Sequence, residues 1–223
     1  KPLKPTPLGQ QLLAHVQRVN VLEEQLSVRT GISDEASPLS IAINNDVLAT
    51  WFSDVMSRFS FRCANPVHIF NADQTQTRTL LQQGKVMGCI SQTGTPIAGG
   101  ESVRLGNMDY QLYASPEYIA RYLAKGISPE TVTASPGLLY DEFDVALLTS
   151  SYGFLQMAVA GVAWALLPAL QVKEEVRSGK LLPLFPDKYL GVTLFWHWVE
   201  LESDALGELS QCVKDVAKEQ LIY

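Results

Sequence analysis

One stretch constrains the fold of this chain more than any other, because in it an apolar strand turns directly into an amphipathic helix. Residues 39–43 form a short apolar run suited to a buried strand, and apolar residues then recur at helical spacing over 47–59. The junction, residues 44–46, is Asn-Asn-Asp. Such a junction lies past the carboxyl end of the strand, which is the usual ligand edge of an α/β sheet. The stretch therefore predicts a small-molecule binding protein.

Further strands alternate with helices along the chain. A strand is predicted at 66–70, a helix at 77–83 and a strand at 86–90, and much later a strand at 145–148 precedes a helix from 153 to about 162. This alternation predicts parallel strands joined by right-handed crossovers. We expect an α/β fold with two Rossmann-like lobes of the periplasmic-binding-protein type (type 2), a ligand cleft between them and a linker helix in front.

The first 37 residues are expected to form that linker helix. Thr6 before Pro7 is a helix-start signal, with a hydroxyl cap and a proline in the first turn. A narrow apolar stripe follows at Leu8, Leu12, Val16, Val19, Leu22 and Leu26. The stripe could dock on its own domain, but an end helix with a coiled-coil-like seam favours pairing with a second chain.

The remaining residues divide into two lobes. Residues 38–108 are expected to form the first lobe and 109–189 the second. Strand-like segments are predicted at 103–105 and 110–114, on either side of this boundary. The last segment, 190–223, combines an aromatic strand with an amphipathic helix and is expected to return to the first lobe.

Composition and missing motifs exclude several classes of function. The net charge of −6 argues against a nucleic-acid surface on these residues, because duplex binding needs clustered Lys and Arg. The three cysteines have no C-x-x-C spacing, so no zinc site, metal or disulfide framework is indicated, and reduced thiols fit a cytoplasmic protein. No apolar run is long enough to span a membrane. No hydrolase, zincin, P-loop or dinucleotide motif is present, so we expect neither an enzyme nor a cofactor.

Several motifs together resemble one known family. They are the start at 6–9 with the helix at 11–18, the Asn-Asn-Asp-Val-Leu-Ala-Thr-Trp string at 44–51, Leu-Gly-Asn-Met-Asp-Tyr at 105–110, Ala-Gly-Val at 160–162 leading to Leu-Pro at 167–168, and Phe-Trp-His at 195–197 with Glu-Ser at 202–203. In this order they are similar to the effector-binding half of the LysR-type transcriptional regulators, in the branch that senses lysine and arginine.

The resemblance implies an effector-sensing and oligomerisation module that acts as a homodimer or homotetramer. The family binds DNA through an N-terminal winged helix-turn-helix, which is missing from this chain, so the chain alone is expected to sense without recognising an operator. The family also has a further helix and connection where this sequence passes directly from Asp144 to Val145. The acidic residues beside that point are therefore the loosest part of the resemblance.

An amino acid effector needs donors for its carboxylate and acceptors for its ammonium. The family's effector contacts fall on the first strand-to-helix turn and on the loop after the third strand, which carry over to Asn44, Asp46 and Ser91. Small polar residues at other strand ends are further candidates, because hydroxyls and backbone N–H groups at a helix start favour an anion. The full set of predicted effector-binding residues is Asn44, Asp46, Ser91, Gln92, Thr93, Thr149, Ser150 and Ser151, with Asp141 for a basic side chain.

Less specific interpretations exist for each of these residues. Asp46, Ser150 and Ser151 could be ordinary helix caps, and the acidic residues around Asp141 could form a solvated turn. His197 is a weak candidate for a polar contact near the cleft. A solute-binding receptor of a transporter has the same two lobes and is the main alternative function. Molecular mass separates the two functions, because such a receptor is usually monomeric.

Overall fold

The computed structural model describes residues 38–138, 151–200 and 203–222, together with Thr6, Leu8, Gly9, Leu12, His15, Val16, Val19 and Glu23. The last seven of these N-terminal positions are helical. The hydroxyl of Thr6 accepts a hydrogen bond from the backbone N–H of Gly9 at 3.1 Å, which is the predicted cap. Among the described residues, no helix is long and apolar enough to cross a membrane.

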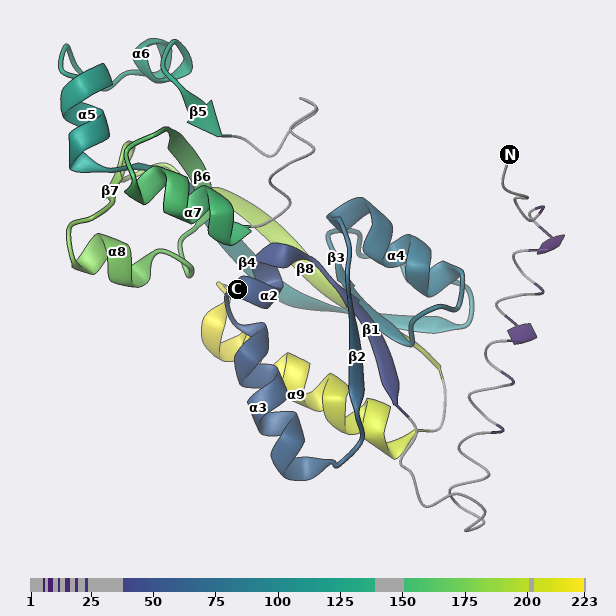
Figure 1. Cartoon of the computed structure of the whole chain (residues 1–223). Helices are drawn as coiled ribbons and strands as arrows, with labels where there is room; N and C mark the ends of the chain where they lie inside the picture. Colours follow the sequence, from purple (N-terminus) through teal and green to yellow (C-terminus); the bar gives the residue numbers. More distant parts are fainter. Residues whose placement is uncertain are drawn as a thin grey trace.

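The described strands form one continuous sheet in the order β2-β1-β3-β8-β4-β6-β5, with β7 paired to β4. Their bounds are β1 Leu39–Ile43, β2 Val67–Asn71, β3 Gly88–Ser91, β4 Gly100–Ala114, β5 Gly137–Leu138, β6 Trp164–Pro168, β7 Leu182–Pro183 and β8 Leu190–Val199. Figure 1 shows two groups of elements joined by the long strands β4 and β8. This is the expected mixed α/β architecture in two lobes.

The strand directions are only partly those predicted from the alternation of strands and helices. β1 is parallel to β2 and β3, and β5 is parallel to β6, as expected for crossover units. β8 instead inserts between β3 and β4 and is antiparallel to both. The prediction of parallel pairing therefore fails at the centre of the sheet, where the chain returns from its C-terminal segment.

β4 corrects the prediction of two separate strands at 103–105 and 110–114. It is a single strand of 15 residues with an irregular register against β8 between Arg104 and Gly106. Gly106 has φ +133°, and a Cβ atom placed on it would lie 2.9 Å from Cβ of Leu221. The bulge explains the missed continuity, because it breaks the alternation of side chains along the strand.

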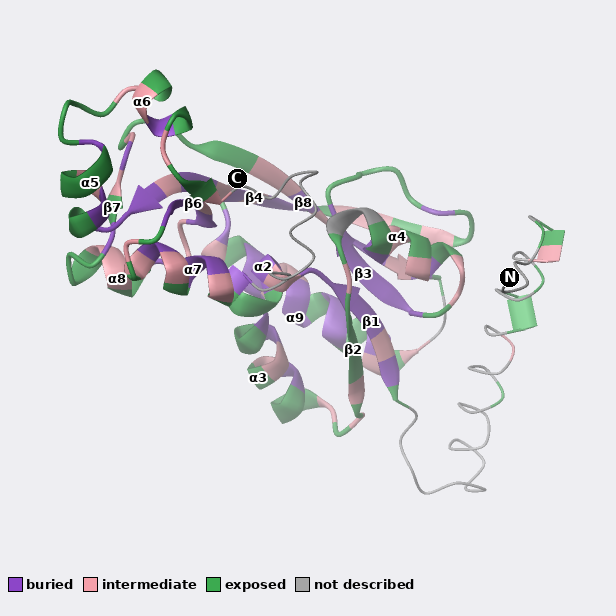
Figure 2. Cartoon of the chain, turned by 45° about the horizontal axis from the view of Figure 1, so that its top comes forward, coloured by how far each residue is buried: buried purple, intermediate pink, exposed green. Residues whose placement is uncertain are grey.

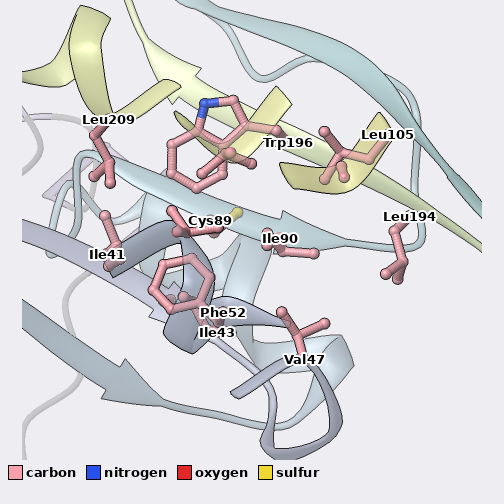
Figure 3. Close-up of a cluster of buried hydrophobic side chains, with 14 of the residues drawn as sticks. Ile41, Ile43, Val47, Phe52, Cys89, Ile90, Leu105, Leu194, Trp196 and Leu209 are labelled. Atoms are coloured by element: carbon pink, nitrogen blue, oxygen red, sulfur yellow. The ribbon is translucent and has the colours of Figure 1, made fainter. Parts of the chain in front are cut away.

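Four helices cover the sheet of the first lobe: α2 Asn45–Ala49, α3 Phe52–Arg62, α4 Gln74–Gln82 and α9 Asp204–Gln220. α9 packs against α3, so the C-terminal segment lies on the first lobe. The fully buried Trp196 belongs to this core, and its indole Nε1 donates to the hydroxyl of Ser210 on α9 at 2.9 Å. Figure 3 shows Trp196 together with apolar side chains from β1, α3, β3 and β4. These contacts hold the first predicted strand and helix in place.

The second lobe has two smaller apolar clusters around α5 Pro116–Tyr122, α6 Pro129–Thr133, α7 Ser151–Val159 and α8 Lys173–Arg177. One cluster places Phe154 and Leu155 of α7 against Leu167 of β6. The other contains Tyr118 and Trp164, whose Nε1 donates to the backbone oxygen of Val132 at 2.8 Å. Figure 2 shows buried residues concentrated along the strands and exposed residues on the outer faces of the helices.

The predicted boundaries between the two lobes stay a prediction. β4 and β8 run through both groups of elements, so the boundary near residues 108 and 190 falls within strands rather than at a linker. The predicted strand at 145–148 and the junction of Asp144 with Val145 lie outside the described residues.

Candidate functional site

The candidate site is built first on the turn that follows β1. β1 is buried along most of its length, and the turn leads directly into the five-residue helix α2. Asn44, which is only 6% exposed, is the N-cap, and its Oδ1 accepts the backbone N–H of Val47 at 3.0 Å. Asp46, two residues later in the first turn of α2, is therefore not the N-cap. Its carboxyl group instead bonds to another side chain.

That carboxyl group is held by a tyrosine from a distant part of the chain. The phenol of Tyr110 donates to Oδ2 of Asp46 at 2.6 Å, and both side chains are 4% exposed. Tyr110 lies on β4, the strand that passes from the first lobe to the second. Sequence reasoning missed this partner. The only local signal was its place in the Leu105–Tyr110 motif, whose function the sequence did not indicate.

The loop after β3 forms the second part of the site. Ser91 is the last residue of β3 and is buried, whereas Gln92 and Thr93 are exposed. The hydroxyl of Ser91 accepts the backbone N–H of Thr93 at 3.2 Å. Because β1 and β3 are parallel neighbours, the turn with Asp46 and the loop with Ser91 lie at the same edge of the sheet. The structure thus brings together two of the three polar clusters predicted from the sequence.

His197 of β8 holds this loop in place through its ring. Its Nε2 lies 2.6 Å from the backbone oxygen of Thr93 and 3.1 Å from Oγ of Ser91. A carbonyl oxygen can only accept, so Nε2 carries the proton, and the neutral ring has its acceptor at Nδ1. Burial lowers the pKa of His197 below 6.5, and the positive charge of Arg78 lowers it further, although the bond to Thr93 opposes the shift. His197 therefore positions the loop as a neutral donor.

The third cluster is described only at Ser151. Ser151 is the first residue of α7, is 1% exposed, and donates to Oε1 of Gln171 at 2.6 Å. α7 contacts α2, so this end of the second lobe lies beside the helix that carries Asp46 (Figure 1). The other predicted members of this cluster, Asp141, Thr149 and Ser150, lie outside the described residues.

The chemistry of the site is that of polar recognition. Among the described residues, no group of three or more His, Cys, Asp or Glu side chains could hold a metal ion. Burial raises the pKa of Cys89, next to the site on β3, to about 12, so this thiol is not an activated nucleophile. What the site offers is a buried carboxyl group, an amide, a serine hydroxyl and the exposed side chains of Gln92 and Thr93. These groups suit a ligand with both an ammonium and a carboxylate.

Comparison with known proteins finds relatives that are all transcriptional regulators. No family model matches the chain. The HTH-type transcriptional regulator ArgP of Vibrio vulnificus is 32% identical over 99% of this chain and 81% of its own length. LysG of Corynebacterium glutamicum, solved with its bound effector Arg, is 26% identical with a TM-score of 0.87 over 100% of this chain and 82% of that one. ArgP of Mycobacterium tuberculosis is 25% identical with a TM-score of 0.87, over 100% and 81%.

Proposed function

The chain belongs to the LysR-type transcriptional regulators, in the lysine- and arginine-responsive branch, and we propose that it senses a basic amino acid in the cleft between its lobes. The family consists of regulators, so the chain is not an enzyme. This membership also disfavours the solute-binding receptor as an alternative. The proposed effector is arginine or lysine, in line with the arginine bound to LysG. The observation that carries the proposal is the buried carboxyl group of Asp46, held by Tyr110 at the ligand edge of the sheet.

Each residue of the proposed site contacts the effector group that matches its own chemistry. Asp46 accepts from the α-ammonium group of the effector. Asn44 uses its Oδ1 to cap α2, which leaves its Nδ2 group to donate to the effector carboxylate. Ser91, Gln92 and Thr93 add hydrogen bonds from the neighbouring loop.

The second lobe completes the proposed site. Ser151 and the preceding hydroxyl residues Thr149 and Ser150 contact the effector from that lobe. Asp141 is proposed to bind the basic side chain, because a guanidinium or ammonium group pairs best with a carboxylate.

Binding in the cleft would act through the relative angle of the lobes. An effector shifts that equilibrium only by the difference in its affinity for the two arrangements. Tyr110 and His197 lie on β4 and β8, the two strands that join the lobes. Each forms a hydrogen bond to one of the two proposed effector-binding loops of the first lobe. We propose that these contacts transmit the change to a winged helix-turn-helix DNA-binding domain attached through the N-terminal helix.

Self-association is proposed to occur through that N-terminal helix. Leu8, Leu12 and Val16 repeat at four-residue spacing and are 66%, 58% and 52% exposed. An exposed apolar stripe of this kind is stabilised when it packs against a second copy. We propose a homodimer or homotetramer in the cytoplasm, and sedimentation of the chain should give a mass above that of the monomer. Leu12→Lys should shift this mass toward the monomer.

Thermal unfolding with added ligands tests the proposed effector. Arginine or lysine at about 100 times its dissociation constant should add roughly 2.7 kcal/mol to the free energy of unfolding, whereas norleucine, which lacks the basic group, should add much less. Asp46→Asn should abolish most of the arginine effect. Asp54→Asn, at an exposed position of α3, is the matched control and should leave it unchanged.

Two results would contradict the proposal. No stabilisation by either basic amino acid would remove the effector assignment while leaving family membership in place. Stabilisation that is equal in Asp46→Asn and Asp54→Asn would remove Asp46 from the site.

A further inference from the structure

A pocket of about 410 Å³ lies in the second lobe, and Tyr110, whose hydroxyl donates to Asp46, is one of its lining residues. Leu112 of β4 and Leu166 of β6, which are paired in the sheet, line it together with Phe185 and Lys188 from the segment between β7 and β8. We name it the Lys188 pocket. Its volume falls within the range of about 300–1,000 Å³ that is typical of small-molecule sites.

The wall of the Lys188 pocket is fixed by hydrogen bonds within the protein. Nε2 of Gln111 donates to the backbone oxygens of Phe185 and Pro186 at 2.8 and 2.9 Å. The backbone N–H of Leu184 donates to the oxygen of Leu112 at 2.8 Å. These bonds tie the segment after β7 to β4, so the pocket exists before any ligand arrives. A preformed pocket avoids the entropic cost of ordering a loop on binding.

The charge of the Lys188 pocket selects one kind of ligand. The ammonium group of Lys188 lies 5.4 Å from the centre of the Phe185 ring and makes no ion pair with any described carboxylate. None of the described lining residues is Asp or Glu, and most of them are aliphatic or aromatic. A cation that has no ion pair with the described carboxylates and lies beside an apolar wall complements an anion with an apolar body.

We propose that the Lys188 pocket is a second small-molecule site, which binds monocarboxylates with an aromatic or aliphatic body. The carboxylate pairs with Lys188, and the body packs on Leu112, Leu166 and Phe185. Tyr110 lines this pocket and its hydroxyl holds Asp46, so the two sites share one residue. The proposal does not depend on which effector occupies the cleft.

Binding of 3-phenylpropionate, measured by isothermal calorimetry on the full chain, tests the proposal. A ligand of this size should bind with a dissociation constant on the order of 0.1–1 mM. The neutral analogue 3-phenylpropanamide and the variant Lys188→Gln should each weaken binding roughly fivefold, as expected for a partly exposed ion pair. Lys180→Gln, at another exposed lysine of the same lobe, is the matched control and should bind as the unchanged chain does.

The outcomes separate this site from the proposed effector cleft. A roughly fivefold weakening of 3-phenylpropionate binding in Lys188→Gln, with unchanged binding in Asp46→Asn, supports the second site. Absence of binding, equal binding of the acid and its amide, or loss in Asp46→Asn but not in Lys188→Gln would overturn it. Arginine titrations of the same variants report on the effector proposal separately, because Lys188 and Asp46 are changed one at a time.

Discussion

The hydrogen bond from Tyr110 to Asp46 gives the sharpest test of how the site is held together. Tyr110→Phe removes only the phenol oxygen and keeps the ring that packs in the first-lobe core. Both partners are 4% exposed, so water cannot easily replace the lost donor. A buried acceptor that loses its partner costs about 1–3 kcal/mol. For a chain of this size, that corresponds to a fall in melting temperature of about 2–12 °C.

Thermal unfolding of Tyr110→Phe alongside Tyr189→Phe measures this cost. Tyr189 is 57% exposed, so its variant removes a phenol oxygen that water can already reach, and the free energy of unfolding should change by less than about 0.5 kcal/mol. Tyr110→Phe should also weaken arginine binding, because Asp46 loses the bond that orients it. Equal melting temperatures for the two variants would refute the reasoning, since they would show that the 2.6 Å contact contributes no stability.

Three further predictions follow from single positions. Burial lowers the pKa of His197 below 6.5, so the unfolded chain binds a proton on this ring at a higher pH than the folded chain does. The stability due to the neutral ring is therefore complete above pH 6.5 and is lost as the pH falls below that value. Denaturant titrations from pH 7.5 to 5 should show this slope, and His197→Gln should flatten it. Gly106→Ala should lower the free energy of unfolding by about 1–3 kcal/mol, because of the φ of +133° and the 2.9 Å approach to Leu221. Gly207→Ala on α9 is the control: its added methyl group meets nothing within 4 Å, so it should not destabilise the chain in the same unfolding assay. Cys89 should resist thiol reagents in the folded chain at pH 8 and react after unfolding, since its pKa is raised to about 12; rapid native labelling, located by mass spectrometry, would contradict this.

Local patterns in the sequence were sufficient for the elements at the ligand edge. The apolar run of β1 and the helical spacing after it depend only on neighbouring residues, so the strand and the helical character of 47–59 could be predicted. The single helix expected there is divided in the structure into α2 and α3, with Thr50 as the C-cap of α2. The sequence offered Asp46 as an ordinary helix cap, because aspartate favours that position. The structure assigns the cap to Asn44 through its bond to Val47. Asp46 is therefore not the cap, and its carboxyl group accepts the hydrogen bond from Tyr110.

The sequence by itself determined the class of elements, the family resemblance and the two polar loops at parallel strand ends. Only the tertiary structure decided what holds those loops. Tyr110 is 64 residues from Asp46 and His197 is 106 residues from Ser91, so no local periodicity records either contact. Both contacts come from β4 and β8, and β8 reaches them by inserting antiparallel between β3 and β4. Strand order is set by packing between distant segments, and for that reason the sequence could place the ligand edge but not the residues that brace it.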